Sequence, residues 1–220
     1  MAVTAQQVID AKVHLGSLKN ESHPKTSQYW VEVTNGLVVM NPEIIAQQIN
    51  TLHEKIAKAK QEGKEILVVS EKKMYAQDLE ELAKKSGFSY LNYKIPGGFL
   101  TNFNTFKKRI DDINEMASFL ESEEYHSLTK KEQLVYKRKF ARVNKIYKGV
   151  TKLTKRPEIV VVLDGNMLGI FLDEAKRIPN MDTLVIASSN FPRYWDWESI
   201  VMANVASHKS LDFVVKNILS

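Results

Sequence analysis

The stretch IVVVLD at residues 159–164 decides the fold of this chain. Five branched apolar residues in a row, followed by an aspartate, are typical of a strand that is buried on both faces of a parallel sheet. Four further runs have a similar character, namely residues 36–40 (GLVVM), 66–70 (ILVVS), 89–93 (SYLNY) and 183–188 (TLVIAS). Together they predict an α/β fold with a doubly wound, mainly parallel sheet.

Helical patterns between these runs support the alternation of strands and helices. Asn41 followed by Pro42 favours a helix start, and the apolar periodicity then continues as far as Gly63. The first twelve residues (MAVTAQQVIDAK) are typical of a short helix and show no secretory signal pattern. Further helices are predicted at residues 73–86, 167–177 and 208–219.

The connection between two of the predicted strands, residues 94–158, is far longer than one crossover requires. Apolar residues within it recur at alternating steps of three and four, which is the spacing of a heptad seam. We therefore expect a coiled-coil hairpin of residues 101–154, inserted into an α/β globular domain of residues 1–100 and 155–220. The two seams are Phe103, Phe106, Ile110, Ile113, Ala117 and Leu120, and then Tyr136, Phe140, Val143, Tyr147, Val150 and Leu153.

Positive charge is concentrated in the second half of this hairpin. The chain has a net charge of +5, but residues 128–156 contain eleven Lys or Arg and one acid, a net of +10. The other residues contain 20 basic and 25 acidic side chains, a net of −5. A concentrated basic stripe is the electrostatic footprint of a polyanion such as nucleic acid, and the alternative is a solvated helix face. Some charges are expected to pair with acids of the first arm.

Sequence motifs of enzymes are missing. No G-x-G-x-x-G fingerprint, Walker loop, G-x-S-x-G elbow or cysteine occurs in the chain. Gly97 and Gly98 could approach a phosphate closely, but a turn into the hairpin is the favoured interpretation. Asp164 could hold a metal at a strand end, but a turn role is favoured. His14 is interpreted as a structural histidine whose polar atoms are satisfied.

Residues 191–197 (FPRYWDW) gather aromatic side chains in a predicted loop. If the loop is exposed, it is a partner surface or a stacking platform. If it is buried, it is a lid over the edge of the sheet. The candidate protein-binding residues in it are Phe191, Arg193, Tyr194, Trp195 and Trp197.

Several segments, in the same order along the chain, resemble the second universal family of small-subunit ribosomal proteins in its bacterial type. KIPGGFLTN at 94–102 is similar to the family's R-W-x-G-G-x-L-T-N and is the most specific match. VHLGSLKNESHPK at 13–25 resembles V-H-F-G-H…N-P-K, and ILVVSEKK at 66–73 resembles a strand ending in G-T-K-R. LTKKE at 128–132 and PEIVVVLD at 157–164 match further family segments. The resemblance implies a flavodoxin-like sheet with an inserted hairpin.

The chain departs from the family pattern at positions with which metal ions are sometimes associated. Ser17 replaces a histidine, and ASSNFP at 187–192 replaces D-T-N-S-D-P, so that both acids are lost. His14 and Asp164 remain without these partners. We therefore expect a divergent, compact member with no metal and no cofactor.

The resemblance implies a structural protein that supports translation between the head and body of the small ribosomal subunit, not an enzyme. The expected partners are small-subunit rRNA and neighbouring ribosomal proteins, with the large RNA-binding ribosomal protein one as a further candidate. A membrane and a homo-oligomer are not expected. The expected location is ribosome-bound in the bacterial cytoplasm, or alternatively on an organellar ribosome. The candidate RNA-binding residues are Lys25, Lys72, Lys73, Lys94, Asn102, Lys107, Lys130, Lys131, Lys137, Arg138, Arg142 and Lys145.

Two other classes of function stay open. A small α/β enzyme would act at the strand ends near Ser70, Gly97 and Asp164, although no nucleophile and base pair is visible there. A protein–protein adaptor would use the hairpin as a coiled-coil arm and would bind with little dependence on salt. The +10 segment argues against the adaptor.

Overall fold

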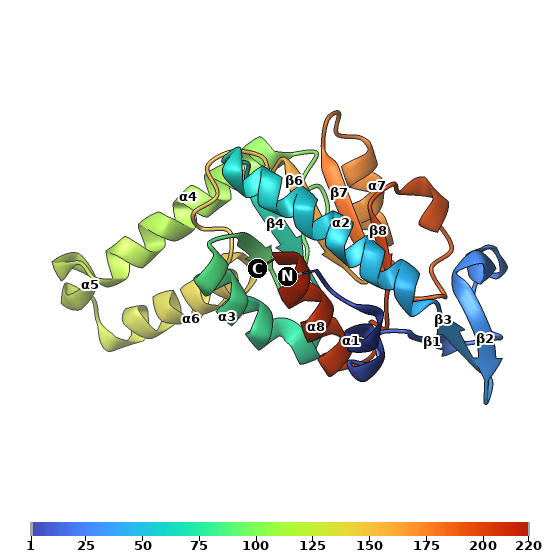
Figure 1. The fold of residues 1–220 in the computed structure, drawn as a ribbon. Helices are drawn as coiled ribbons and strands as arrows, with labels where there is room; N and C mark the ends of the chain where they lie inside the picture. The colour runs from blue at the N-terminus through green and yellow to red at the C-terminus, as the bar shows by residue number, and fades with distance from the viewer. Residues whose placement is uncertain (1, 220) are drawn as a thin grey trace.

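A five-stranded parallel sheet forms the centre of the molecule (Figure 1). A computed structural model describes residues 2–219, except for the side chain of Tyr194. Every residue of the two central strands β4 and β6 is buried, as the continuous apolar runs predict. Along the sheet the strands are β5 (Ser89–Leu91), β4 (Ile66–Val69), β6 (Ile159–Leu163), β7 (Asp182–Ala187) and β8 (Ile200–Met202).

The strand order is that of flavodoxin-like folds. The chain moves from β4 to β5 on one side, then returns to β6 on the other side and continues through β7 to β8. The direction of winding therefore reverses between β4 and β6. In open α/β sheets, ligands bind at this reversal, outside the carboxyl ends of the strands. The predicted doubly wound α/β fold is confirmed.

Helices cover the two faces of the sheet. Helices α2 (Pro42–Gln61), α3 (Ala76–Ser86) and α8 (His208–Leu219) pack together over one face, with α1 (Ala5–Asp10) beside α2. Helix α7 (Gly169–Lys176) lies behind the sheet in Figure 1. Right-handed crossovers in opposite directions place their helices on opposite faces, which explains this arrangement.

A separate three-stranded antiparallel sheet corrects one prediction. Residues 36–40 are expected in the parallel sheet, but β3 (Leu37–Met40) lies between β1 (Leu15–Leu18) and β2 (Trp30–Thr34) in the small sheet. Asn35 and Gly36 both have positive φ and join β2 to β3 in a tight hairpin, a turn that Asn-Gly favours. The sequence prediction took the apolar run as decisive and missed this turn signal.

The long connection between β5 and β6 forms a helical arm that projects from the sheet (Figure 1). It contains α4 (Phe103–Leu120), α5 (Glu123–Ser127) at the tip, and α6 (Lys130–Tyr147). Thr129 begins α6 with a reciprocal capping box to Glu132. Within residues 2–219, no ion pair joins α4 to α6, so the expected pairing of charges across the hairpin is not found. The division into domains at residues 100 and 155, and the coiled-coil character of the arm, stay predictions.

Gly149 anchors the returning end of the arm to the edge strand β5. Its carbonyl accepts a hydrogen bond from the N–H of Tyr90 at 3.0 Å. A Cβ at Gly149 would lie 2.2 Å from the carbonyl oxygen of Tyr90, a backbone atom that cannot move aside without disturbing β5. We expect Gly149→Ala to lower the free energy of unfolding by about 2–3 kcal/mol, measured by urea denaturation.

Gly169→Ala is the matched control for this variant. At Gly169 nothing lies within 4 Å of the added carbon, and the position is the first residue of α7. Alanine there is expected to leave stability unchanged or slightly raised. Equal effects at the two glycines would show that the close approach to Tyr90 is unimportant.

Candidate RNA-binding surface

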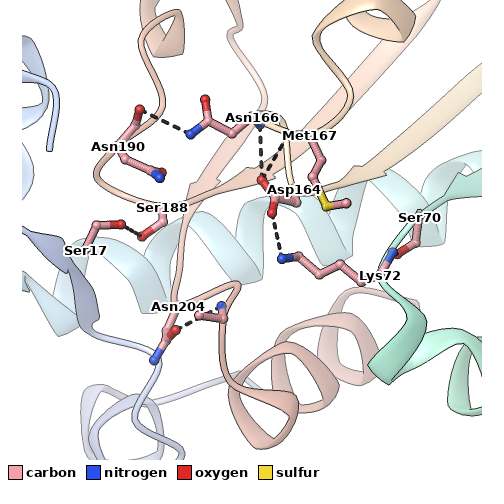
Figure 2. A network of polar contacts seen from close by, with 10 residues as sticks. Ser17, Ser70, Lys72, Asp164, Asn166, Met167, Ser188, Asn190 and Asn204 are labelled. Atoms are coloured by element: carbon pink, nitrogen blue, oxygen red, sulfur yellow. Dashed lines mark hydrogen bonds and ion pairs between the residues drawn. The ribbon is translucent and has the colours of Figure 1, made fainter. Parts of the chain in front are cut away.

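The carboxyl ends of β4 and β6 hold an internal ion pair (Figure 2). Lys72 Nζ lies 2.7 Å from Asp164 Oδ2, and the two side chains are only 15% and 9% exposed. Asp164 Oδ1 accepts hydrogen bonds from the backbone N–H groups of Asn166 at 3.1 Å and Met167 at 3.4 Å. Both carboxylate oxygens are thus satisfied within the chain, and the favoured turn role of Asp164 is confirmed. The pairing argues against the predicted RNA contact of Lys72.

Hydroxyl groups hold the small sheet to the loop after β7. Ser17 Oγ lies 3.4 Å from Ser188 Oγ (Figure 2), and the N–H of Ser17 donates to Ser189 Oγ at 2.9 Å. His14 Nδ1 is buried without a hydrogen-bond partner in the described part of the chain, so the expectation of a satisfied histidine is corrected. Among residues 2–219, no group of three or more His, Cys, Asp or Glu side chains is placed to hold a metal ion.

The Pro-Gly-Gly loop before the arm is held by acidic side chains of the protein itself. The N–H of Gly98 donates to the carboxylate of Glu174, and the N–H of Leu100 donates to the same carboxylate at 3.2 Å. Glu71 Oε1 accepts from the N–H of Ile95 at 2.9 Å. Because backbone donors that could cradle a phosphate already bind Glu174, the turn interpretation of Gly97 and Gly98 holds. Sequence reasoning missed Glu174, which lies far along the chain.

These contacts weaken the case for an enzyme at the strand ends. Ser70 is completely buried, and its Oγ accepts from the N–H of Lys72 at 3.2 Å. Asp164 is fully bonded, and the loop of Gly97 is held by Glu174. At the strand ends where the alternative enzyme would act, Ser70, Asp164 and the loop of Gly97 are therefore engaged in contacts within the chain.

Helix α6 presents the largest uncompensated charge among the predicted residues. Its exposed basic side chains take part in no ion pair within residues 2–219. Lys145 lies 4.0 Å from the ring centroid of Tyr93, and Lys137 lies 5.9 Å from that of Tyr125. Sequence reasoning missed Lys139, although its place in the basic stripe was the available signal. These exposed residues are Lys130, Lys131, Lys137, Arg138, Lys139, Arg142 and Lys145.

The other predicted RNA-binding residues are spread over the molecule. Lys73 and Lys94 are exposed and follow the strands β4 and β5. Asn102 precedes α4, where its Oδ1 accepts from Thr105 Oγ1 at 2.9 Å and makes no cap bond to the backbone. Lys107 pairs with Asp111 at 2.7 Å. The structure thus gathers one set on α6 and leaves the others near the strand ends and the base of the arm.

Lys25 belongs to the segment between β1 and β2, and the small sheet of these strands lies at the opposite end of the molecule from α5 at the tip of the arm (Figure 1). Lys25 is part of the short helical turn η1 (Pro24–Tyr29), and its Nζ lies 4.3 Å from the ring centroid of Trp195. Trp195 is 49% exposed and also contacts the ring of His23, with centroids 5.5 Å apart. The part of the aromatic loop at Trp195 is therefore exposed on the surface of the protein.

The rest of the aromatic loop is held against the protein. Phe191 is 2% exposed and fills the space above Gly165, so its predicted protein-binding role is corrected to a core position. Arg193 forms ion pairs with Asp173 and Asp196, and the hydrogen bond from Arg193 lowers the pKa of Asp173. Trp197 is partly buried beside the core, and the side chain of Tyr194 lies outside the described part of the structure.

Glu80 ties helix α3 to the base of the arm. Its carboxylate binds the ammonium group of Lys148 and lies 3.1 Å from that of Lys84. The hydrogen bond from Lys148 holds the pKa of Glu80 below its ordinary value of 4.5. A lowered folded-state pKa stabilises the protein above the unfolded-state pKa, and this contribution is lost as the pH falls through the lowered value.

We therefore expect Glu80→Gln to reduce the free energy of unfolding at neutral pH and to have little effect in strong acid. The loss near pH 7 is expected to be about 0.5–1 kcal/mol, because the pair is partly exposed. Urea denaturation of both proteins at several pH values measures it. A loss of the same size at all pH values would show that the carboxylate charge is not responsible.

Comparison with known proteins identifies the family. The profile of the family described as ribosomal protein S2 matches residues 8–220. The chain belongs to the ribosomal protein S2 family. The predicted resemblance is thereby confirmed.

Relatives in the family are distant. Small ribosomal subunit protein uS2 of Coprothermobacter proteolyticus is 31% identical over 176 residues, which are 80% of this chain and 66% of that protein. The uS2 proteins of Petrotoga mobilis and Fusobacterium nucleatum are 29% and 30% identical, covering 83% and 79% of this chain and 64% and 70% of those proteins. The chain spans about two thirds of the length of these relatives, and it is a divergent member. Among the described helices, none has the length and apolar character needed to cross a membrane.

Proposed function

We propose that this chain is a structural, non-enzymatic component of the small ribosomal subunit that binds rRNA through helix α6. The observation that supports the proposal best is the set of exposed basic side chains on α6 that have no acidic partner within residues 2–219. A duplex of RNA hides its base edges in a narrow groove, so a basic helix contacts mainly phosphate and ribose. Such contacts position a protein on RNA without reading its sequence.

Contacts with neighbouring ribosomal proteins complete the proposal. The matched relatives are named as small ribosomal subunit proteins, which supports a place beside other proteins of that subunit. The position between its head and body is proposed from the family resemblance. The large RNA-binding ribosomal protein one is a candidate neighbour, and exposed Trp195 with Lys25 is a candidate contact surface. The proposed location is on the ribosome of a bacterial cytoplasm, with an organellar ribosome as the alternative.

Sedimentation of a cell lysate on a sucrose gradient tests the proposal. We expect the chain to migrate with small subunits and whole ribosomes in low salt. A high-salt wash is expected to release it, because binding to phosphates depends steeply on salt. Detection of the chain only in the soluble fractions at the top of the gradient would refute a ribosomal role.

A further inference from the structure

The two long helices of the arm enclose an open groove. A cavity of about 840 Å³ lies between α4 and α6. Most of the apolar side chains in its floor are half-buried, whereas Ile113 is 2% exposed. We call this cavity the arm groove; its apolar floor consists of Ile113, Met116, Phe119, Tyr136, Val143 and Ile146.

Aromatic rings connect the two long helices at both ends of the arm. Near the tip, the rings of Phe119 and Tyr136 have centroids 4.9 Å apart, and Tyr125 contacts both. At the base, Phe106 contacts Tyr147 with centroids 6.4 Å apart. These ring contacts bridge α4 and α6 beyond the two ends of the half-buried aliphatic residues of the groove.

The rims of the arm groove carry opposite charges that do not pair with each other. Asp112 and Glu115 line the α4 side, while Lys139 and Arg142 line the α6 side, and Arg109 adds a positive charge on α4. No ion pair within residues 2–219 joins the two rims. An RNA backbone would suit one rim only, because the two carboxylates would repel its phosphates. A polypeptide can present both signs of charge.

We propose that the arm groove binds an amphipathic helix from a neighbouring ribosomal protein, an inference that rests on the proposed function. Its apolar face, with anchors at helical spacing, lies on the floor of the groove. Basic side chains along one edge face Asp112 and Glu115, and acidic side chains along the other edge face Lys139 and Arg142. The arm thus contacts RNA with the outer face of α6 and protein with its groove.

Site-specific photo-cross-linking in intact small subunits tests this inference. The full chain is produced in cells with p-benzoylphenylalanine at Met116 on the groove floor, and small subunits are isolated by sedimentation and irradiated. Mass spectrometry is expected to find a cross-link to one ribosomal protein segment with apolar residues at helical spacing and charges of opposite sign along its two edges. The matched control is the same probe at Leu134, which is 49% exposed on α6 outside the groove, and it is expected not to reach that segment.

A charge variant tests whether the charged rims of the groove select the partner. The double variant Asp112→Lys with Glu115→Lys changes two exposed side chains and makes the rims uniformly basic. We expect it to reduce the protein cross-link from Met116 at least about 10-fold. A cross-link to RNA, no cross-link in subunits that contain the chain, or a yield unchanged by the double variant would overturn the inference while leaving the proposed function intact. Absence of the chain from the subunits would instead overturn both.

Discussion

Charge reversal of Lys131, Arg138 and Lys145 to glutamate is expected to release the chain from the small ribosomal subunit. The three residues are seven positions apart, so they lie along one side of α6, and all are exposed without an ion-pair partner in the described residues. Each reversal removes a phosphate contact and adds a repulsive charge. We expect binding to weaken about 100-fold or more, and the slope of log affinity against log salt to decrease by about three.

Binding of the purified variant to salt-washed small subunits measures this effect. A matched variant reverses Lys12, Lys19 and Lys85, three exposed lysines elsewhere that also lack ion pairs within residues 2–219. The two variants have the same net charge, so the matched variant is expected to bind almost as the parent does. The free energy of unfolding of each variant, measured by urea denaturation, is expected to differ from that of the parent by less than about 0.5 kcal/mol, since exposed side chains contribute little to stability. Equal loss of binding in both variants would show that α6 is not the specific contact.

The sequence predicts the central sheet well because burial on both faces leaves a continuous apolar run. Strands β4 and β6 are of this kind. Strand β2 alternates polar and apolar residues and has Val31 61% exposed, while β8 has only three residues, so neither is marked by such a run. Strand β3 has the run but not the partners expected of it, because the Asn35-Gly36 turn pairs it with β2.

For the candidate RNA-binding surface too, some features follow from the local sequence and others depend on tertiary contacts. The basic residues of α6 follow directly from composition. Whether a given lysine or arginine is free to bind RNA depends on whether an acidic side chain pairs with it in the fold, and composition alone does not show this. Lys72 and Lys107 look like equivalent candidates in the sequence, but one is buried against Asp164 and the other pairs with Asp111 within its own helix. The heptad pattern likewise does not reveal the groove between α4 and α6.

Lys72→Met is expected to cause the largest loss of stability among the variants considered. It leaves the carboxylate of Asp164 buried and without its cationic partner, at 9% exposure. Breaking a buried pair by removing one partner costs about 3–5 kcal/mol, because the remaining charge stays desolvated. The midpoint of urea denaturation and the melting temperature measure the loss. The double variant Lys72→Met with Asp164→Asn tests whether the isolated charge is the cause.

The double variant is expected to recover most of the lost stability. An asparagine at position 164 tolerates the left-handed backbone, where φ is 78°, and its side-chain oxygen can still accept from the N–H groups of Asn166 and Met167. Asp164→Asn alone is expected to cost less than Lys72→Met, because the longer lysine side chain can move its ammonium group toward water. If the double variant were as unstable as Lys72→Met, packing of the lysine stem would be the cause. Recovery would instead show that the unpaired carboxylate of Asp164 causes the loss, at the reversal point where other sheets of this order bind a ligand.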